Sequence, residues 1–425
     1  MITRVSHASP LLPLSFMAVA ALAFVLAGLA LPWLAADLAG HYYHPHILAL
    51  THTLTLGWIT MAILGASYQL IPIVLERPVW SERLGHWEVG LVTLGAAGIA
   101  GHAAIASWPG LIWGAGFLAA GVSAHVLNTA LTLRGLSRWS FSAAMLAMGF
   151  AGLVLTTIFG AALGVEHTHA FLPGDFYARL HAHVHLALLG WVLPVVLGVS
   201  AHVYPLFMLA PRPGRRTLTI QAAGLALGAP AVVIGLLAAP GLAAAGALAV
   251  GAAIAAHVSW LVRLLCVSRR PAFDWALRFL VTGAVYLTAA TVLGMALAFG
   301  ATAGPRPALA YGVLIVGGWA SLTIVGMMLK IVPFLVWYRV YAPLAGRTPV
   351  PGLADMRSPT TEGLAFVTLT AGVAALAVAV WVGDATVIRA AAAIVLVGAL
   401  AFGATIVTVL RHLVAAMPSA VPRPS

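Results

Sequence analysis

The stretch HYYHPHILALTHTLTLGWITMAILGASYQLIP, residues 41–72, contains the pattern on which the whole chain is built. Histidines gather at its start, and a long apolar run with a Gly-Trp pair at 57–58 comes after them. The apolar part is long enough to cross a bilayer as a helix, which takes about 20 residues. An ionisable residue inside a membrane is costly and is by default a candidate for function. The stretch therefore predicts a membrane helix with polar chemistry near one end.

Apolar runs of this kind cover most of the 425 residues, of which 62% are hydrophobic and 7% charged. A soluble domain is about half apolar and about a quarter charged, so this composition excludes an ordinary soluble protein. It also excludes nucleic acid as a partner, although the net charge is +11. The single cysteine, Cys266, excludes an internal disulfide and a cysteine-based metal cluster. We expect an all-α integral membrane protein that forms one domain over residues 1–425.

Breaks at Pro, Gly and Arg divide the apolar sequence into twelve expected transmembrane spans. They lie at 11–36, 46–75, 87–107, 110–134, 139–164, 178–209, 217–239, 241–266, 274–300, 307–338, 361–382 and 387–412. With these spans, 17 of the 20 Arg fall on the side of the two termini and three on the other. Loops rich in Arg stay in the cytoplasm. We therefore expect a bacterial-type inner membrane protein with both termini in the cytoplasm.

The Gly-Trp spacing of the opening stretch occurs three times. Each copy has Gly-Trp, a Gly eight residues after the first Gly, and a Pro seven residues later. The copies start at Gly57, Gly190 and Gly318, which are 133 and 128 residues apart. A fixed period indicates a repeated structural unit. We expect three four-helix units around a pseudo-threefold axis, with helices 46–75, 178–209 and 307–338 at equivalent positions.

The histidines of two of these helices predict a cofactor site. His52 and His185 both lie five residues before their Gly-Trp pair, so we expect them at one depth in the outer half of the membrane. Neutral imidazole is a common ligand of haem iron, zinc and copper. Two such histidines on neighbouring helices could hold a haem between them. His183 is two residues from His185 and points roughly the opposite way, so it could serve a second site.

Other polar residues carry weaker predictions. His44, His46 and His181 lie at the outer mouth and are candidate metal ligands, sites of metal uptake or interfacial residues. Gln69, His202 and Lys330 share one position of the repeat, three residues before its Pro, and could form a polar ring or a proton path. We interpret His125, His202 and His257 mainly as packing residues between helices, hydrogen-bonded to carbonyl groups.

These motifs resemble subunit I of the haem–copper oxidase superfamily. Within it they are most similar to the branch of cbb-type oxidases and nitric oxide reductases. LTHTLTLGW, residues 50–58, is similar to the setting of a low-spin haem ligand in that family, and HVHLALLGW, residues 183–191, to its HVHxxxLGW element. The resemblance implies that His52 and His185 ligate a low-spin haem and that His183 ligates a high-spin haem. A related resemblance is to the haem-containing membrane family linked to the nitric oxide response.

The chain also departs from the oxidase pattern. The family carries its HxH element on the tenth span, whereas here it lies on the sixth, and the seventh span lacks the paired copper-ligand histidines. We therefore expect a relative without the usual copper B site. It would bind one haem b, or two if His183 holds the second, with copper as a further candidate.

Two functions are compatible with these features. One is a haem protein for electron transfer or for O2 or NO chemistry, and the other is a copper or haem delivery protein that uses its outer histidines. Whether the protein is an enzyme stays open; if it is, we expect an oxidoreductase. The expected partners are the lipid bilayer, a quinol or cytochrome c electron donor, and further subunits.

Overall fold

The computed structural model describes residues 9–75, 77–134, 136 and 138–415, and within these residues it contains helices and no strand. Eleven of its helices are long and apolar enough to cross a membrane. The chain is therefore a multi-pass, all-α membrane protein whose surroundings are a lipid bilayer.

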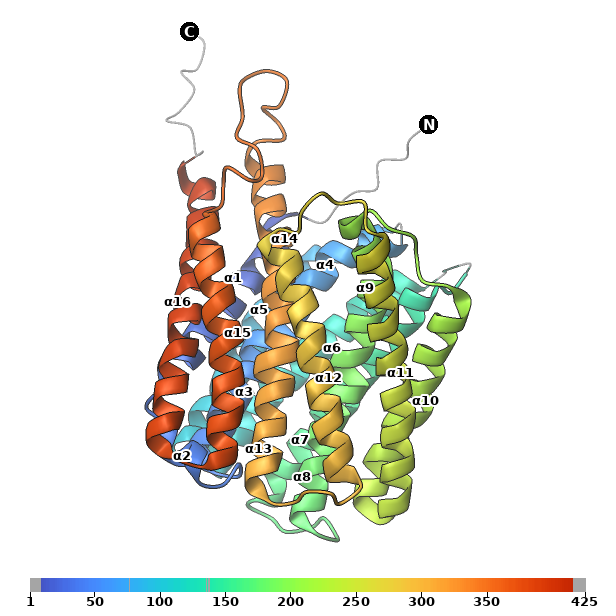
Figure 1. The fold of residues 1–425 in the computed structure, drawn as a ribbon, viewed down its shortest axis with the longest axis vertical. Helices are drawn as coiled ribbons and strands as arrows, with labels where there is room; N and C mark the ends of the chain where they lie inside the picture. Colours follow the sequence, from blue (N-terminus) through green and yellow to red (C-terminus); the bar gives the residue numbers. More distant parts are fainter. Residues whose placement is uncertain (1–8, 76, 135, 137, 416–425) are drawn as a thin grey trace.

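Twelve long helices and one short helix make up the described fold (Figure 1). Three of the long helices are each divided into three consecutive segments, α, η and α. In chain order the elements are α1 (Leu11–Ala30), α2 (Ala35–Ala39), α3 (Pro45–His52), η1 (Thr53–Thr60), α4 (Met61–Leu75), α5 (Glu82–Ala104), α6 (Trp108–Leu133), α7 (Phe141–Glu166), α8 (Phe176–His185), η2 (Leu186–Val192), α9 (Leu193–Met208), α10 (Arg215–Ala238), α11 (Pro240–Val267), α12 (Trp275–Ala298), α13 (Pro305–Gly312), η3 (Val313–Ala320), α14 (Ser321–Val340), α15 (Pro359–Val382) and α16 (Ala385–Ala415).

Eleven of the twelve expected spans are confirmed as helices of sufficient length and apolar character. The span expected at 87–107 is a helix, α5, but it is not among the eleven. Its first two turns carry Glu82, Arg83 and Glu88, which lower its hydropathy. The span expected at 11–36 is shorter than predicted, because α1 ends at Ala30 and the chain turns into α2.

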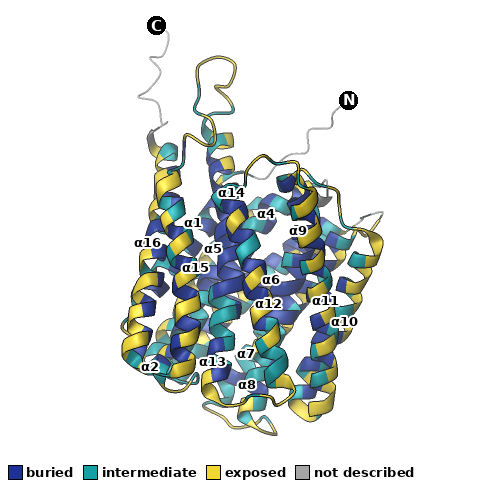
Figure 2. Ribbon diagram, in the orientation of Figure 1, coloured by how far each residue is buried: buried dark blue, intermediate teal, exposed yellow. Residues whose placement is uncertain are grey.

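Three of the long helices are interrupted by π-helix at their Gly-Trp pair. These three, which we call the bent helices, are α3–η1–α4, α8–η2–α9 and α13–η3–α14. In the most apolar stretches of these three helices, 56%, 56% and 67% of the residues are buried. In the other helices that could span the membrane, apart from α1, the buried share of the corresponding stretch is 33% to 44%. Figure 2 shows this contrast as a dark centre behind exposed outer faces. π-helix is rare and is frequently found at functional sites.

The second glycine of each repeat lets a bent helix pack closely against the long helix that precedes it. A Cβ on Gly65 would lie 2.6 Å from Phe16 of α1, and a Cβ on Gly198 would lie 2.7 Å from Met145 of α7. A Cβ on Gly326 would lie 2.7 Å from the Ala276 carbonyl oxygen of α12. Small residues of this kind let membrane helices approach each other closely. The repeated glycine therefore marks the same helix contact three times.

Two tryptophans of the repeat donate hydrogen bonds from one bent helix to another. Trp58 Nε1 donates to Ser321 Oγ at 3.0 Å, and Trp191 Nε1 donates to Thr60 Oγ1 at 3.3 Å. Each acceptor lies two residues after the Trp of its own repeat. In the second repeat this position is the apolar Leu193, which cannot accept a hydrogen bond through its side chain. The bent helices therefore meet in the centre of the bundle, near their Gly-Trp pairs.

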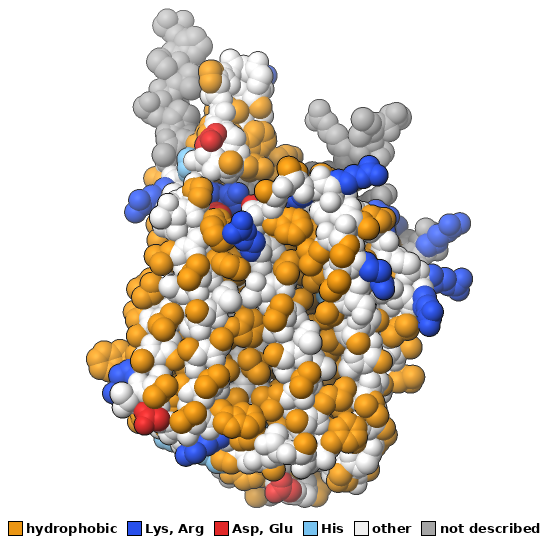
Figure 3. Space-filling view, viewed as in Figure 1, with side chains coloured by type: hydrophobic (Ala, Val, Ile, Leu, Met, Phe, Trp, Pro, Cys, Tyr) orange, Lys and Arg blue, Asp and Glu red, His pale blue; other side chains and the backbone are white. Residues whose placement is uncertain are grey.

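The first and last helices run antiparallel, so the chain begins and ends at the same end of the bundle (Figure 1). Gly28 packs on Ala399, and Gly403 packs on Val25. On the face drawn in Figure 3, Lys and Arg gather at this end, and apolar side chains cover the middle. Arg4 and Arg423, which are part of the charge count, lie outside the described residues. The opposite end, with α2 and the starts of α3, α8 and α13, is called the α2 end below.

Candidate functional site

A cavity of about 880 Å³ opens toward the α2 end. Its walls are mostly apolar and come from all three bent helices. Six histidines line it, namely His41, His52, His167, His181, His183 and His185. The volume lies near the top of the range of about 300–1,000 Å³ that ligand pockets occupy. The structure thus brings His52, His183 and His185 to one cavity.

His52 and His185 occupy equivalent positions, each directly before a π-helical segment. The Nδ1 of His52 donates a hydrogen bond to the Leu48 carbonyl at 2.8 Å, and the Nδ1 of His185 donates to the His181 carbonyl at 2.8 Å. Each bond uses one ring nitrogen and leaves Nε2 without its proton. Metal-ligating histidines are usually held in this way, because the bond fixes both the tautomer and the ring orientation.

His183 has no such bond. Its Nδ1 is buried and has no hydrogen-bond partner. Gly160 of α7 makes room for the ring, since a Cβ at this position would lie 2.8 Å from His183 Cε1. The ring also lies within electrostatic range of His52. An unsatisfied buried polar atom needs an explanation, and an ion or other ligand that binds there is one of the usual ones.

His185 of α8 has a ring partner on the third bent helix. Its ring stacks on Tyr311, with centroids 5.9 Å apart and planes 14° apart. Tyr311 and His183 both lie seven residues before the first Gly of their own repeats. The pairing of His52 with His185 stays a prediction, and His183, which lines the same cavity, is the alternative partner of His52.

Hydrogen bonds between aromatic side chains close the outer mouth of the cavity. Tyr42 Oη and His181 Nε2 are 3.0 Å apart, and Tyr43 Oη and His167 Nε2 are 2.5 Å apart. Burial, with a smaller effect of Tyr177, raises the pKa of Tyr43 to about 12. Burial also lowers the pKa of His167, although Glu166 opposes this. The phenol of Tyr43 therefore stays protonated at neutral pH and donates to a neutral His167.

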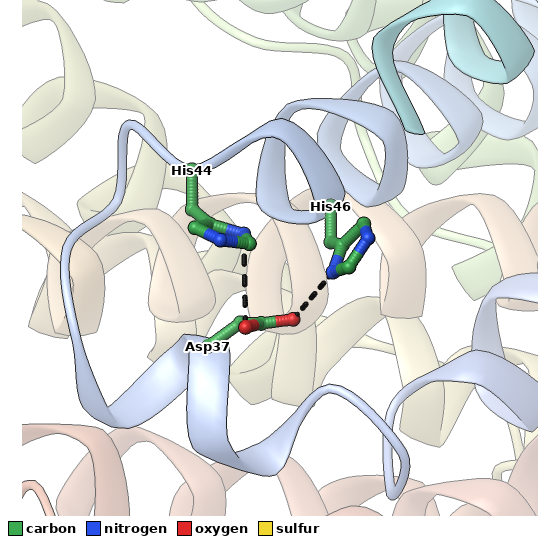
Figure 4. Close-up of side chains that lie close together, drawn as sticks. All are labelled: Asp37, His44 and His46. Carbon is green, nitrogen blue, oxygen red and sulfur yellow. Dashed lines mark hydrogen bonds and ion pairs between the residues drawn. The ribbon is translucent and has the colours of Figure 1, made fainter. Parts of the chain in front are cut away.

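The metal candidates His44, His46 and His181 do not gather at one place. His181 lines the cavity, whereas His44 and His46 lie beside Asp37 and are not part of its wall (Figure 4). The candidate ligand atoms of Asp37, His44 and His46 lie within 4.8 Å of one another. Asp37 was not singled out by the sequence, because nothing in an AAD run next to a loop indicates a metal ligand.

Gln69, His202 and Lys330 lie toward the other end of the bundle. Lys330 donates a hydrogen bond from Nζ to Asp274 Oδ2, and its ammonium lies 5.4 Å from the ring of Phe207. Burial tends to raise the pKa of Asp274, but the hydrogen bond and charge of Lys330, the Leu277 N–H and the charge of Arg270 together outweigh it, so the pKa is lowered. Gln69 is buried and His202 is half-buried. No contact joins these three residues within the described chain, so their common polar ring stays a prediction.

Sequence reasoning missed a buried polar network around Glu88 of α5. His125 Nδ1 is 2.8 Å from Glu88 Oε1, and the Tyr68 hydroxyl donates to Glu88 Oε2 at 2.6 Å. The Asn128 amide donates to the Tyr68 hydroxyl at 3.0 Å, and His125 Nε2 is 3.2 Å from Ser67 Oγ. His125 was interpreted as a packing residue, but its partners are side chains.

The repeat register contains a signal that could have found this network. Glu88 lies 31 residues after Gly57, and Gln221 lies 31 residues after Gly190. At the second copy of this register Gln221 and His257 are buried in turn, and the Gln221 amide and His257 Nδ1 have no hydrogen-bond partner in the described residues. Buried polar residues therefore recur at both copies, but Glu88 and His125 are bonded to each other whereas Gln221 and His257 are not.

The fold and the site together define a multi-pass membrane protein with a histidine-lined apolar cavity at one end. No protein-family model matches the chain, and no curated protein matches it.

Proposed function

We propose that the protein binds b-type haem in the cavity, between the second and sixth long helices, for electron transfer or for reaction with O2 or NO. The observation that carries this proposal is the convergence of His52, His183 and His185 on one large apolar space. A bound haem b would supply reversible one-electron chemistry at its iron. The residues fit such a group, because two of the imidazoles have Nε2 free and the third has an orphaned Nδ1.

His52 would be one protein ligand of the haem, and a histidine of the HxH pair would be the other. The resemblance to oxidases favours His185, whereas the unpartnered, buried Nδ1 of His183 makes that residue the alternative. In the second arrangement His185 keeps its stacking with Tyr311, and its free Nε2 would be available to copper or to a second haem.

The proposal includes a relationship to subunit I of the haem–copper oxidases, without their copper B site. Twelve spans in three four-helix units would share a pseudo-threefold axis. Three observations support this arrangement: the three π-helical segments at the Gly-Trp pairs, the three close glycine contacts, and the donation of each bonded Trp to the unit before it in cyclic order. Trp191 donates to the first unit, and Trp58 donates to the third.

The α2 end would face the outside of a bacterial-type inner membrane, with both termini in the cytoplasm. The split of Arg between the two sides supports this orientation. The electron donor would be a quinol or a cytochrome c, reached directly or through partner subunits. If the protein turns over a substrate, it would do so as an oxidoreductase.

Delivery of copper or haem is the second candidate function. It is favoured by the group of Asp37, His44 and His46 close to the mouth of the cavity. In this case the inner histidines would receive the cargo instead of holding a resident cofactor.

The first experiment is a reduced-minus-oxidised visible spectrum of the purified protein in detergent. We expect the sharp bands of a low-spin haem b, lost in His52→Ala and in either His183→Ala or His185→Ala. The variant that keeps the bands identifies the histidine that is not an axial ligand. Carbon monoxide added to the reduced sample would shift the spectrum only if a haem has an open position.

His202→Ala is the matched control, because this half-buried histidine lies outside the cavity. It should leave the spectrum unchanged. A folded wild-type protein that contains no haem, but contains stoichiometric copper, would reject the cytochrome and support delivery.

A further inference from the structure

A second group of ligand side chains lies at the α2 end, outside the cavity wall. Asp37 comes from α2, His44 caps the start of α3, and His46 belongs to its first turn. Pro45 between the two histidines sits at the first position of α3, and the residue before a proline prefers an extended backbone. His44 is extended, with φ −115° and ψ 142°. This local geometry turns both imidazoles toward α2.

The three side chains point at one another (Figure 4). His46 Nδ1 lies 2.8 Å from Asp37 Oδ2, and His44 Nδ1 lies 3.7 Å from Asp37 Oδ1. The second distance is too long for a hydrogen bond. The Nδ1 of His44 is nevertheless buried and has no other partner. A polar atom that is shielded from water and aimed at a carboxylate without bonding to it indicates a position where a ligand binds.

We propose that Asp37, His44 and His46 bind one divalent transition-metal ion, Zn²⁺ or Cu²⁺. Two imidazoles and a carboxylate suit these ions, whereas Ca²⁺ and Mg²⁺ prefer oxygen ligands alone. With bonds of about 2.0–2.2 Å, two ligand atoms of a tetrahedral Zn²⁺ lie roughly 3.4 Å apart. The two histidine–carboxylate separations, 2.8 and 3.7 Å, lie on either side of this value, and all the ligand atoms lie within 4.8 Å of one another. Side-chain movements alone would bring them around an ion.

The exposure of the site indicates an exchangeable ion. The side chains of His44 and His46 are 41% and 48% exposed, and that of Asp37 is 24% exposed. Three protein ligands on a solvent-facing surface leave the fourth position to water, whereas purely structural zinc sites use four protein ligands. The ion would join α2 to α3 and restrain the loop between them. That loop contains Tyr42 and Tyr43, which close the cavity mouth.

This inference does not depend on haem, and its test has a separate readout. The full chain in detergent is stripped with a chelator, and Zn²⁺ is titrated by calorimetry with metal analysis. We expect one Zn²⁺ per chain and a higher melting temperature, because an ion that binds only the folded state stabilises it. Cu²⁺ should compete for the site and give an electron paramagnetic resonance signal split by two nitrogen ligands.

The variants Asp37→Asn, His44→Ala and His46→Ala should each weaken Zn²⁺ binding at least tenfold. His169→Ala is the matched control, because His169 is an exposed histidine that is not part of the group. The haem spectrum should be unchanged in all four variants, and His52→Ala should still bind Zn²⁺. No stoichiometric Zn²⁺ in the wild type, or full binding by the triple variant, would overturn the proposal and leave only an Asp–His hydrogen bond.

Discussion

Glu88 and His125 are hydrogen-bonded to each other, and their side chains are 0% and 1% exposed. Removing one partner of a buried pair leaves an uncompensated charge or polar group, at a cost of about 3–5 kcal/mol. We therefore expect Glu88→Ala to lower the melting temperature sharply. Glu88→Gln should cost less, because an amide keeps the hydrogen bonds to Tyr68 and His125, and Gln221 already occupies the corresponding position of the second unit.

Thermal unfolding in detergent checks this prediction, with His86→Ala in the same helix as an exposed control. Equal losses in Glu88→Ala and Glu88→Gln would mean that the charge itself is required. In that case Glu88 would have a role that an amide cannot fill, such as holding a proton.

A single methyl group at Gly160 can test which histidine would be the second ligand of the proposed haem. The Cβ of Gly160→Ala would lie 2.8 Å from His183 Cε1, so the ring must move. If His183 ligates the haem, the low-spin bands should shift or weaken, although every histidine is still present. If His185 is the ligand, the spectrum should not change. Gly116→Ala serves as the control, because a Cβ there meets no atom within 4 Å.

At the scale of the helices, the hydrogen bonds of the Gly-Trp pairs hold the bent helices together. Hydrogen bonds between membrane helices are worth about 0.6 kcal/mol on average and at most about 1.7 kcal/mol. Trp58→Phe and Trp191→Phe should each lower stability by about this amount, plus a contribution from lost packing. Trp319→Phe should cost less. The second repeat has the apolar Leu193 where the other two repeats have the acceptors Thr60 and Ser321, and no hydrogen bond from Trp319 occurs in the described chain.

The melting temperatures of the three variants, measured side by side, decide between hydrogen bonding and packing. A loss in Trp319→Phe as large as in the other two would show that packing alone accounts for the effect.

The sequence predicted the helices well, because spacing and hydropathy act locally. The three Gly-Trp repeats, the apolar runs and most helix ends come from these local properties. The π-helical segments could not be predicted, since VLIVGGWA in η3 contains no residue that distinguishes it from an ordinary apolar helix. A π-helical turn uses i→i+5 hydrogen bonds, so it rotates the helix on its C-terminal side relative to the helix on its N-terminal side. Predictions of which residues share a helix face fail across such a segment.

For the whole molecule, the sequence predicted that histidines would gather in the outer half, and the structure brings six of them to one cavity. It could not predict which ring faces which, because this depends on how helices from distant parts of the sequence meet. Tyr311, which lies 126 residues after His185 in the sequence, stacks on the imidazole ring of His185. Asp37 escaped notice for the same reason, since its role depends on the turn between α1 and α3.

The orientation of the molecule in the membrane is expected from its charge and can be tested with single cysteines. The background is Cys266→Ser, which removes the only native cysteine. His169→Cys places a thiol in the exposed loop at the α2 end, and Gly214→Cys places one in the exposed loop before α10, at the end rich in Arg. Neither residue lines the cavity, and a Cβ at Gly214 meets no atom within 4 Å.

A membrane-impermeant thiol reagent added outside intact cells should label His169→Cys and spare Gly214→Cys. Gly214→Cys should become labelled once the inner membrane is opened. The reverse pattern would place the cavity mouth in the cytoplasm, so that its haem would meet donors and gases from that side. It would also expose the group of Asp37, His44 and His46 to the metal pool of the cytoplasm instead of the outer compartment. The labelling pattern therefore determines which side of the membrane the cavity mouth faces.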